Sequence, residues 1–271
     1  MLIPNLFFLF FLFGLGLFFG SFANVVVLRL HAEQNGIFGG RSECPKCKHL
    51  LGFWDLVPLF SWIFLLGKCR YCKNPISWRY PFGEAIMGIL WVFLFFFSGI
   101  SLESILSGVD MARAGYFLLL GFFVHILFFA DLYFSEVHRY VSVPAIAVAL
   151  LFLPFSFTPT LSHALLGALI PIAFFGTQIL LSRFVFTSRG DWVGEGDLDL
   201  GILMGLVLGW KGVMIALFLS YLLGSFVGVA VMIKKGRGEQ VPFGPFLLIA
   251  MIITLFWGQY IADWYWGILG L

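Results

Sequence analysis

Apolar stretches of membrane-spanning length occupy most of this 271-residue chain. A helix needs about 20 apolar residues to cross a bilayer. Stretches near that length lie at about 5–28, 82–99, 114–134, 141–157, 161–182, 198–210, 212–233 and 243–260, with a predicted turn at Gly209–Gly212 between the sixth and the seventh. Because 61% of the residues are hydrophobic and the mean hydropathy is +1.01, a soluble globular fold is excluded. The sequence predicts an all-α polytopic membrane protein with about eight transmembrane helices.

Two cysteine pairs interrupt this pattern between the first two apolar stretches. Cys44 and Cys47 form one C-x-x-C pair, Cys69 and Cys72 form the other, 21 residues separate the pairs, and the chain has no further cysteine. This spacing favours four thiolates around one zinc ion, with no open position for water or substrate. The alternative is one or two disulfides, which need an oxidising compartment.

The distribution of Lys and Arg predicts the orientation of the spans. Eight of the sixteen Lys and Arg residues lie between Arg29 and Arg79, and basic loops beside membrane spans are normally cytoplasmic. With that loop inside, fourteen of the sixteen lie inside, and only Arg113 and Lys211 lie outside. A reducing cytoplasm favours zinc over disulfides. The net charge of +2 is too small to suggest a nucleic-acid partner.

Two aspartates reach the same predicted depth from opposite directions. Asp131 lies near the end of the third span, which runs inward, and Asp197 near the start of the sixth, which runs outward. Ionisable groups at this depth are functional candidates. Two carboxyls held close can share one proton, so that one activates water and the other polarises a scissile carbonyl. Alternatively, Asp197 caps its helix and Asp131 marks where its span meets water.

These features together resemble the type IV prepilin peptidases, bacterial inner-membrane aspartyl proteases. The resemblance covers nearly the whole chain, and the matching aspartates imply that Asp131 and Asp197 are the catalytic pair. It also implies prepilin or pseudopilin substrates, cleavage on the cytoplasmic side and, in many members, methylation of the new N-terminus with S-adenosylmethionine. The matching segments occur in the family's order: Gly20-Ser21-Phe22-Ala23-Asn24-Val25-Val26, the stretch from Cys44 to Glu84, Asp131, Gly194-Glu195-Gly196-Asp197 and Val241-Pro242-Phe243-Gly244-Pro245-Phe246.

The chain departs from the family pattern at two places. Val137-His138-Arg139 stands where the family usually has Ile-Pro-Asp, and Asp199 stands where it usually has Lys. Asp199 adds a carboxylate near Asp197 that disfavours charge there, and an inward-pointing Arg139 would offset it. We expect an altered pH dependence rather than lost activity.

Four further polar residues have alternative interpretations. His125 is expected to face away from Asp131, as a satisfied or lipid-edge histidine. Asn24 either lines a substrate groove or forms an interhelical hydrogen bond. Arg29 either lines the same groove or extends its charged end to the membrane surface as a snorkelling cation. Glu84 is either a charge near a helix N-terminus or a site residue.

The predicted organisation has three parts: a first transmembrane helix at 1–28, a cytoplasmic zinc-binding loop domain at 29–81 and transmembrane aspartyl peptidase helices at 82–271. The first helix lacks a basic segment and a cleavage pattern, so we expect it to be retained. The predicted function is leader cleavage by a multi-pass protein of the bacterial inner membrane, in contact with membrane lipid. The alternative is a non-catalytic zinc-knuckle membrane component of a pilus or secretion assembly.

Overall fold

The computed structural model of the chain describes residues 6–33, 40–100, 104, 108–155, 159–184, 194–236 and 241–269. Residues 34–39 of the predicted loop domain are therefore outside the described part. The chain divides into two compact units, Met1–Phe129 and Ala130–Leu271.

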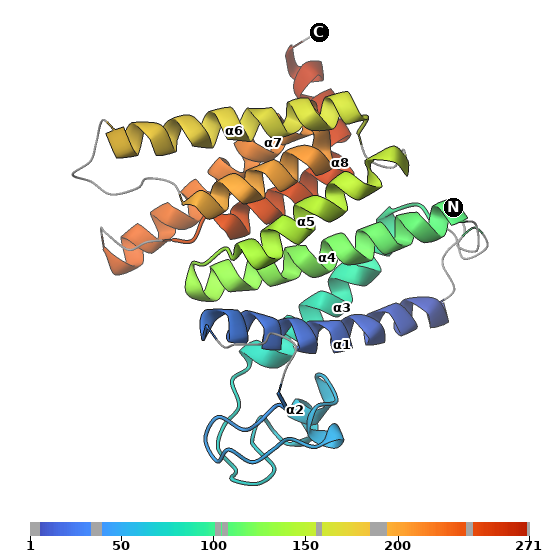
Figure 1. The fold of residues 1–271 in the computed structure, drawn as a ribbon, viewed down its shortest axis with the longest axis vertical. Helices are drawn as coiled ribbons and strands as arrows, with labels where there is room; N and C mark the ends of the chain where they lie inside the picture. Colours follow the sequence, from blue (N-terminus) through green and yellow to red (C-terminus); the bar gives the residue numbers. More distant parts are fainter. Residues whose placement is uncertain are drawn as a thin grey trace. The chain divides into compact units, whose positions relative to one another are not determined.

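Helices account for almost all regular structure in the described residues (Figure 1). No strand occurs there, and the β-structure consists of two isolated bridges in the cysteine-containing segment. The α-helices are α1 (Leu6–His31), α2 (Phe60–Phe64), α3 (Arg79–Phe97), α4 (Gly108–Phe134), α5 (Arg139–Phe152), α6 (Leu161–Phe184), α7 (Glu195–Lys235) and α8 (Gly244–Leu269), with 3₁₀ turns at Phe53–Asp55 and Leu153–Phe155.

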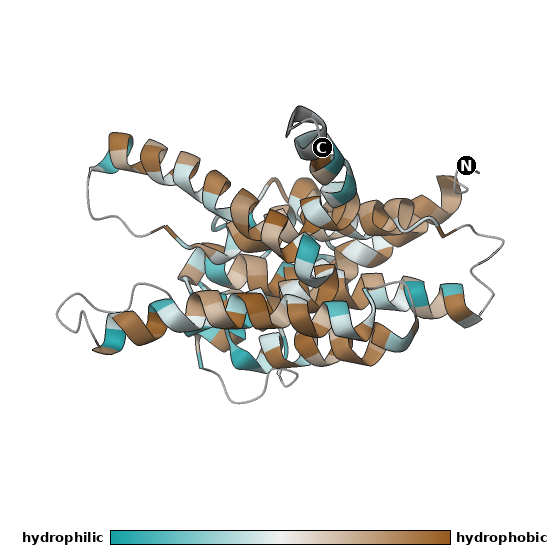
Figure 2. Ribbon diagram, turned by 90° about the horizontal axis from the view of Figure 1, so that it is seen from above, coloured by the Kyte–Doolittle hydropathy of each residue, from teal (hydrophilic) through white to brown (hydrophobic). Residues whose placement is uncertain are grey.

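The long helices have the length and composition of membrane spans. Six helices of the described chain, α1, α3, α4, α6, α7 and α8, are long and apolar enough to cross a bilayer, and α5 with the following turn is a shorter apolar segment. Figure 2 shows apolar residues along most of each long helix. A helix that is apolar on all sides suits lipid rather than water. The predicted all-α polytopic membrane fold is confirmed.

Helix α7 contains two of the predicted spans. Gly209 interrupts it with φ 70° and ψ 177°, a conformation that only glycine adopts readily. Gly201 lies against Phe175 of α6, while the ring of Tyr221 lies 5.8 Å from the neighbouring Phe174. In one straight helix, residues 201 and 221 would be about 30 Å apart. The chain therefore reverses at Gly209, inside the predicted turn, and the sixth and seventh spans are antiparallel halves of α7.

Small residues let helices α1 and α3 of the first unit approach closely. A Cβ added to Gly16 would lie 2.7 Å from the Cα of Gly88, and one added to Gly20 would lie 2.8 Å from the Cα of Glu84. Such contacts between backbones are typical of membrane helix pairs, in which packing rather than water exclusion drives association.

In the second unit, a row of glycines likewise lets α6 and the first half of α7 approach closely. Gly201, Gly205 and Gly209 recur every four residues and face Pro171, Gly167 and Pro159, respectively. The backbones at Gly167 and Gly205 leave no room for a side chain. This contact holds the first half of α7, which contains Asp197.

Candidate functional site

Asp131 lies one turn before the end of α4. The helix ends because Ser135 adopts a positive φ of 56° and its N–H donates to the carbonyl of Asp131 over 2.8 Å. The Asp131 side chain is buried, with 6% of its surface exposed. Within the described residues its Oδ2 has no hydrogen-bond partner, and a Cβ added to Gly244 would lie 2.6 Å from that atom. Gly244 therefore leaves room for the carboxyl at the start of α8.

Asp197 lies in the first turn of α7. The N-cap of this helix is Gly194, so the alternative in which Asp197 is itself the N-cap residue is wrong. The N–H of Asp197 donates to the carbonyl of Gly194 over 3.1 Å, and the N–H of Gly194 faces the Asp197 carboxyl. A Cβ added to Gly196 would lie 2.5 Å from the Cβ of Val137. Glycine at 196 lets α7 begin directly against the segment that follows α4.

The structure brings the two aspartates together. The Asp131 and Asp197 carboxyls lie close enough for their charges to interact, although 66 residues separate them in the sequence. The Asp197 carboxyl also interacts with Tyr221, whose ring packs 4.8 Å from Phe243. Sequence reasoning missed Tyr221, because the predicted turn at Gly209 does not specify which side chains of the two halves of α7 come together.

Two of the residues that depart from the family pattern, Arg139 and Asp199, belong to a polar network beside Asp197. Ser142 donates to Oδ2 of Asp199 over 2.8 Å, and Nε of Arg139 lies 3.8 Å from the same oxygen. Arg139 also pairs with Glu195 at 3.3 Å, and Arg183 pairs with Glu195 at 2.8 Å. Arg139 thus lies beside the carboxylate whose charge it was expected to offset.

The other polar candidates lie in the first unit. His125 is 2% exposed, and neither ring nitrogen has a hydrogen-bond partner among the described residues. The expectation of a satisfied or lipid-edge histidine is therefore wrong. Asn24 donates to the carbonyl of Tyr80 over 3.0 Å, which is the predicted interhelical bond, and Arg29 donates to the carbonyl of Gly40 over 3.2 Å. Glu84 accepts the N–H of Leu59 over 2.7 Å.

The four cysteines converge on one point. Their sulfur atoms all lie within 4.8 Å of one another, and those of Cys44 and Cys72 are 3.9 Å apart. Zinc–sulfur bonds of about 2.3 Å in a tetrahedron place sulfurs about 3.8 Å apart. The residues therefore fit a tetrahedral zinc ion, and all four are free thiols rather than disulfides.

The two cysteine loops are structural copies, offset by 25 residues. Cys44 donates its N–H to the carbonyl of His49, and Cys69 does the same to Asn74. The residue after each second cysteine, Lys48 or Lys73, has a positive φ and donates its N–H to the carbonyl of the first cysteine. Each loop therefore turns its two sulfurs toward the same centre, as zinc knuckles do.

Local hydrogen bonds favour thiolates at part of this cluster. Backbone N–H groups lower the pKa of Cys44, and the backbone and side-chain N–H groups of Asn74 lower the pKa of Cys72 to about 6. The N–H of His49 has the same effect on Cys47, but burial and the neighbouring thiols raise the pKa of Cys47 to about 11. Without a cation, the four sulfurs cannot all carry charge.

Comparison with known proteins matches two successive parts of the chain. Residues 15–97 match the bacterial peptidase A24 N-terminal domain, and residues 117–229 match the type IV leader peptidase family. A prepilin leader peptidase/N-methyltransferase of Aeromonas hydrophila is 32% identical, with 97% of this chain and 95% of the relative aligned. Relatives of the same name in Stutzerimonas stutzeri and Pseudomonas aeruginosa are each 30% identical, with 93% of this chain and 91% of the relative aligned. No solved structure matches.

Proposed function

The chain belongs to the type IV leader peptidase family, and we propose that it cleaves the leaders of type IV prepilins or pseudopilins with Asp131 and Asp197 as its catalytic pair. The observation that carries this proposal is that the two carboxyls, at the end of α4 and the start of α7, lie close enough for their charges to interact. Both belong to the second unit, so their proximity is a property of one compact body.

The proposed mechanism is that of an aspartyl peptidase. The ionised carboxylate takes a proton from water while the water oxygen attacks the scissile carbonyl carbon, and the protonated carboxyl donates to the carbonyl oxygen. Collapse of the tetrahedral intermediate breaks the C–N bond: the leaving amine takes the proton that the first carboxyl removed from water, and the oxygen of the former carbonyl returns its proton to the second carboxylate. The two carboxyls suit this exchange because two close charges favour sharing one proton.

The glycines around the pair support the same chemistry. Gly244 and Gly196 allow α8 and the segment after α4 to approach the carboxyls without intervening side chains. A site bounded by backbone leaves space for an extended peptide to lie close to both aspartates. We propose that the leader junction binds there in extended form.

The orientation and the loop domain complete the proposal. The excess of Lys and Arg between Arg29 and Arg79 favours a cytoplasmic loop in the bacterial inner membrane, with 29–81 as the zinc-binding domain and 82–271 as the peptidase helices. The four cysteines would hold a zinc ion with a structural role, because four sulfur ligands would leave no open position for water or substrate.

We further propose that the chain methylates the new N-terminus, as the names of its relatives suggest. S-adenosylmethionine would supply the methyl group. The pocket in the cysteine domain lined by Trp54, Phe60, Phe64 and Arg70 does not fit this donor, because no acidic side chain lines it to balance the ammonium and sulfonium charges. We therefore assign no residue to the donor.

Coexpression with a prepilin tests the peptidase proposal. The N-terminus of the pilin is measured by mass spectrometry with the wild-type chain and with the variants Asp131→Asn and Asp197→Asn, all at matched membrane levels. We expect a leader-free product from the wild type alone, and a methyl increment on that product. A wild-type chain that leaves the leader in place would favour the non-catalytic zinc-knuckle component instead.

A further inference from the structure

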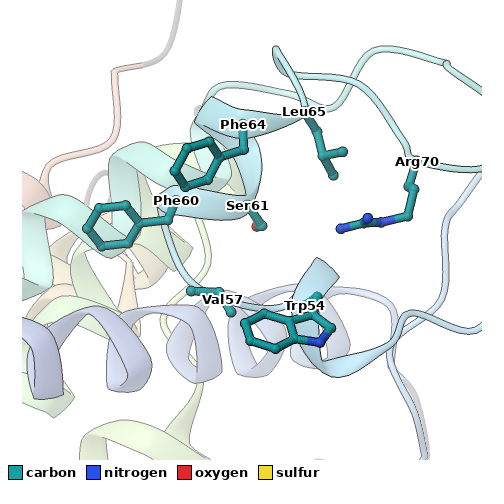
Figure 3. A pocket seen from close by; sticks show the side chains of 7 residues that line it. All are labelled: Trp54, Val57, Phe60, Ser61, Phe64, Leu65 and Arg70. Atoms are coloured by element: carbon teal, nitrogen blue, oxygen red, sulfur yellow. The ribbon is translucent and has the colours of Figure 1, made fainter.

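The cysteine domain exposes a cluster of large apolar side chains. Phe64 is 81% exposed, Leu66 is 82% exposed and Trp54 is 74% exposed. We call this cluster the aromatic face, and it consists of Phe53, Trp54, Phe60, Ile63, Phe64 and Leu66. Figure 3 shows Trp54 opposite the α2 side chains across a shallow pocket, with Arg70 at its side. A soluble loop domain rarely leaves so many apolar groups in water, so the face has a partner.

A buried hydrogen bond ties this face to a membrane helix. The N–H of Leu59, directly before α2, donates to Oε2 of Glu84 over 2.7 Å. Glu84 is buried and lies about 7 Å beyond the first residue of α3. Because the α3 helix is long and apolar enough to span the bilayer, the beginning of α2 is held beside the first turns of a span.

Two further contacts fix which side of α2 points outward. The indole N–H of Trp62 donates to the carbonyl of Ile76 over 3.1 Å, and its ring packs against Gly67. Trp62 therefore anchors the inner side of α2, while Phe60, Ile63 and Phe64 remain on the exposed side. These contacts hold α2 in place with its apolar side chains on the exposed side.

The charges beside the aromatic face indicate the kind of partner. Lys68 and Lys73 line a second pocket together with Phe64 and Leu66. At the start of α3, Trp78 is also exposed and is followed by Arg79. Aromatic residues mixed with Lys and Arg at the end of a membrane span are typical of the headgroup region of an anionic leaflet.

We infer that the aromatic face lies in the headgroup region of the leaflet at which α3 begins, as an interfacial membrane contact of the cysteine domain. The apolar side chains enter the boundary between headgroups and acyl chains, and Lys68 and Lys73 contact anionic lipid phosphates. The Leu59–Glu84 bond sets the depth of the face relative to α3. This inference depends on the membrane fold and not on the proposed catalytic pair.

Lipid photocrosslinking tests the contact directly. The full-length protein is reconstituted in vesicles of phosphatidylethanolamine and phosphatidylglycerol that contain a phospholipid with a diazirine near the glycerol end of an acyl chain. After illumination, adducts are mapped by proteolysis and mass spectrometry. We expect adducts on residues 53–66 and on α3, none on residues 41–48, and fewer on residues 53–66 when phosphatidylcholine replaces the anionic lipid.

A matched pair of variants separates insertion from chance proximity. Phe60→Ser with Phe64→Ser should lose most of the adducts on Trp54 and Leu66, whereas Leu50→Ser, at an exposed leucine of the first cysteine loop, should keep them. Metal content shows whether the double variant and Leu50→Ser are folded. If the double variant does not fold, the adduct map of the wild-type protein alone tests the inference. Unlabelled residues 53–66 beside a labelled α3 would overturn the inference. Loss of adducts on adding a prepilin would also overturn it, and would assign the face to the substrate.

Discussion

Replacing Gly196 by alanine should nearly abolish cleavage without unfolding the protein. The added Cβ would lie 2.5 Å from the Cβ of Val137 and 2.8 Å from its Cγ2. Carbon atoms in contact settle about 3.5 Å apart, so the start of α7 and the segment after α4 must separate by about 1 Å. These two segments adjoin Asp197 and Asp131, respectively. A misplacement of about 1 Å can cost about 100-fold in rate, which corresponds to about 2.7 kcal/mol in the barrier.

Gly194 provides the control within the same motif. A Cβ at this position would meet nothing closer than 3.9 Å, and its φ of −71° and ψ of 147° suit any residue. Gly194→Ala should therefore keep the rate within about threefold of the wild type. Val137→Gly combined with Gly196→Ala removes the clash and should restore part of the activity.

The assay is leader cleavage by purified, reconstituted protein at prepilin concentrations below KM, with rates normalised to folded protein. The account predicts that Gly196→Ala is slow, that Gly194→Ala is nearly normal and that the double variant is intermediate. Equal rates for the two alanine variants would refute the packing argument, whether both were active or both inactive.

Three further predictions concern metal, polar network and helix packing. Cys69→Ser should lower the zinc content from about one ion per chain and make residues 41–79 sensitive to protease; full metal occupancy would contradict the site. Ser142→Ala removes the hydrogen-bond donor to Asp199, whose side chain is only 14% exposed. The loss should lower the free energy of unfolding by about 1–3 kcal/mol, as measured by thermal unfolding. An unchanged melting temperature would show that the hydrogen bond from Ser142 to Asp199 does not stabilise the protein. Gly205→Leu should separate α6 from α7 and lower both stability and cleavage, and wild-type values would show that the close approach to Gly167 is unimportant.

The sequence was most informative where one local rule decides the structure. Long apolar stretches have few alternatives to membrane helices, so the spans were predictable. Gly209 could be recognised as a turn because it lies between two apolar stretches that are too long together for one crossing. The cysteine spacing was likewise sufficient to predict a single cluster, because two short loops of this kind bind one metal ion.

Features that depend on which helices meet were not predictable. The repeat of Gly201, Gly205 and Gly209 was visible, but its partner Gly167 is known only from the packing of α6 on α7. The bond from Leu59 to Glu84 joins a loop to a helix with no sequence signal on the loop side, because its donor is a backbone N–H. The charge of Asp199 was expected to require compensation by Arg139, but the contribution of Ser142 was not foreseen.

The measurement that tests the central claim most directly compares the cleavage rates of Asp131→Asn, Asp197→Asn and the double variant, using purified protein and one prepilin. Two carboxyls that share one proton act as a unit, so each single variant should be as inactive as the double variant. Metal content and melting temperature should stay near those of the wild type, because asparagine preserves the size of each side chain. Substantial leader cleavage by either single variant at normal folded levels would contradict a catalytic pair of Asp131 and Asp197.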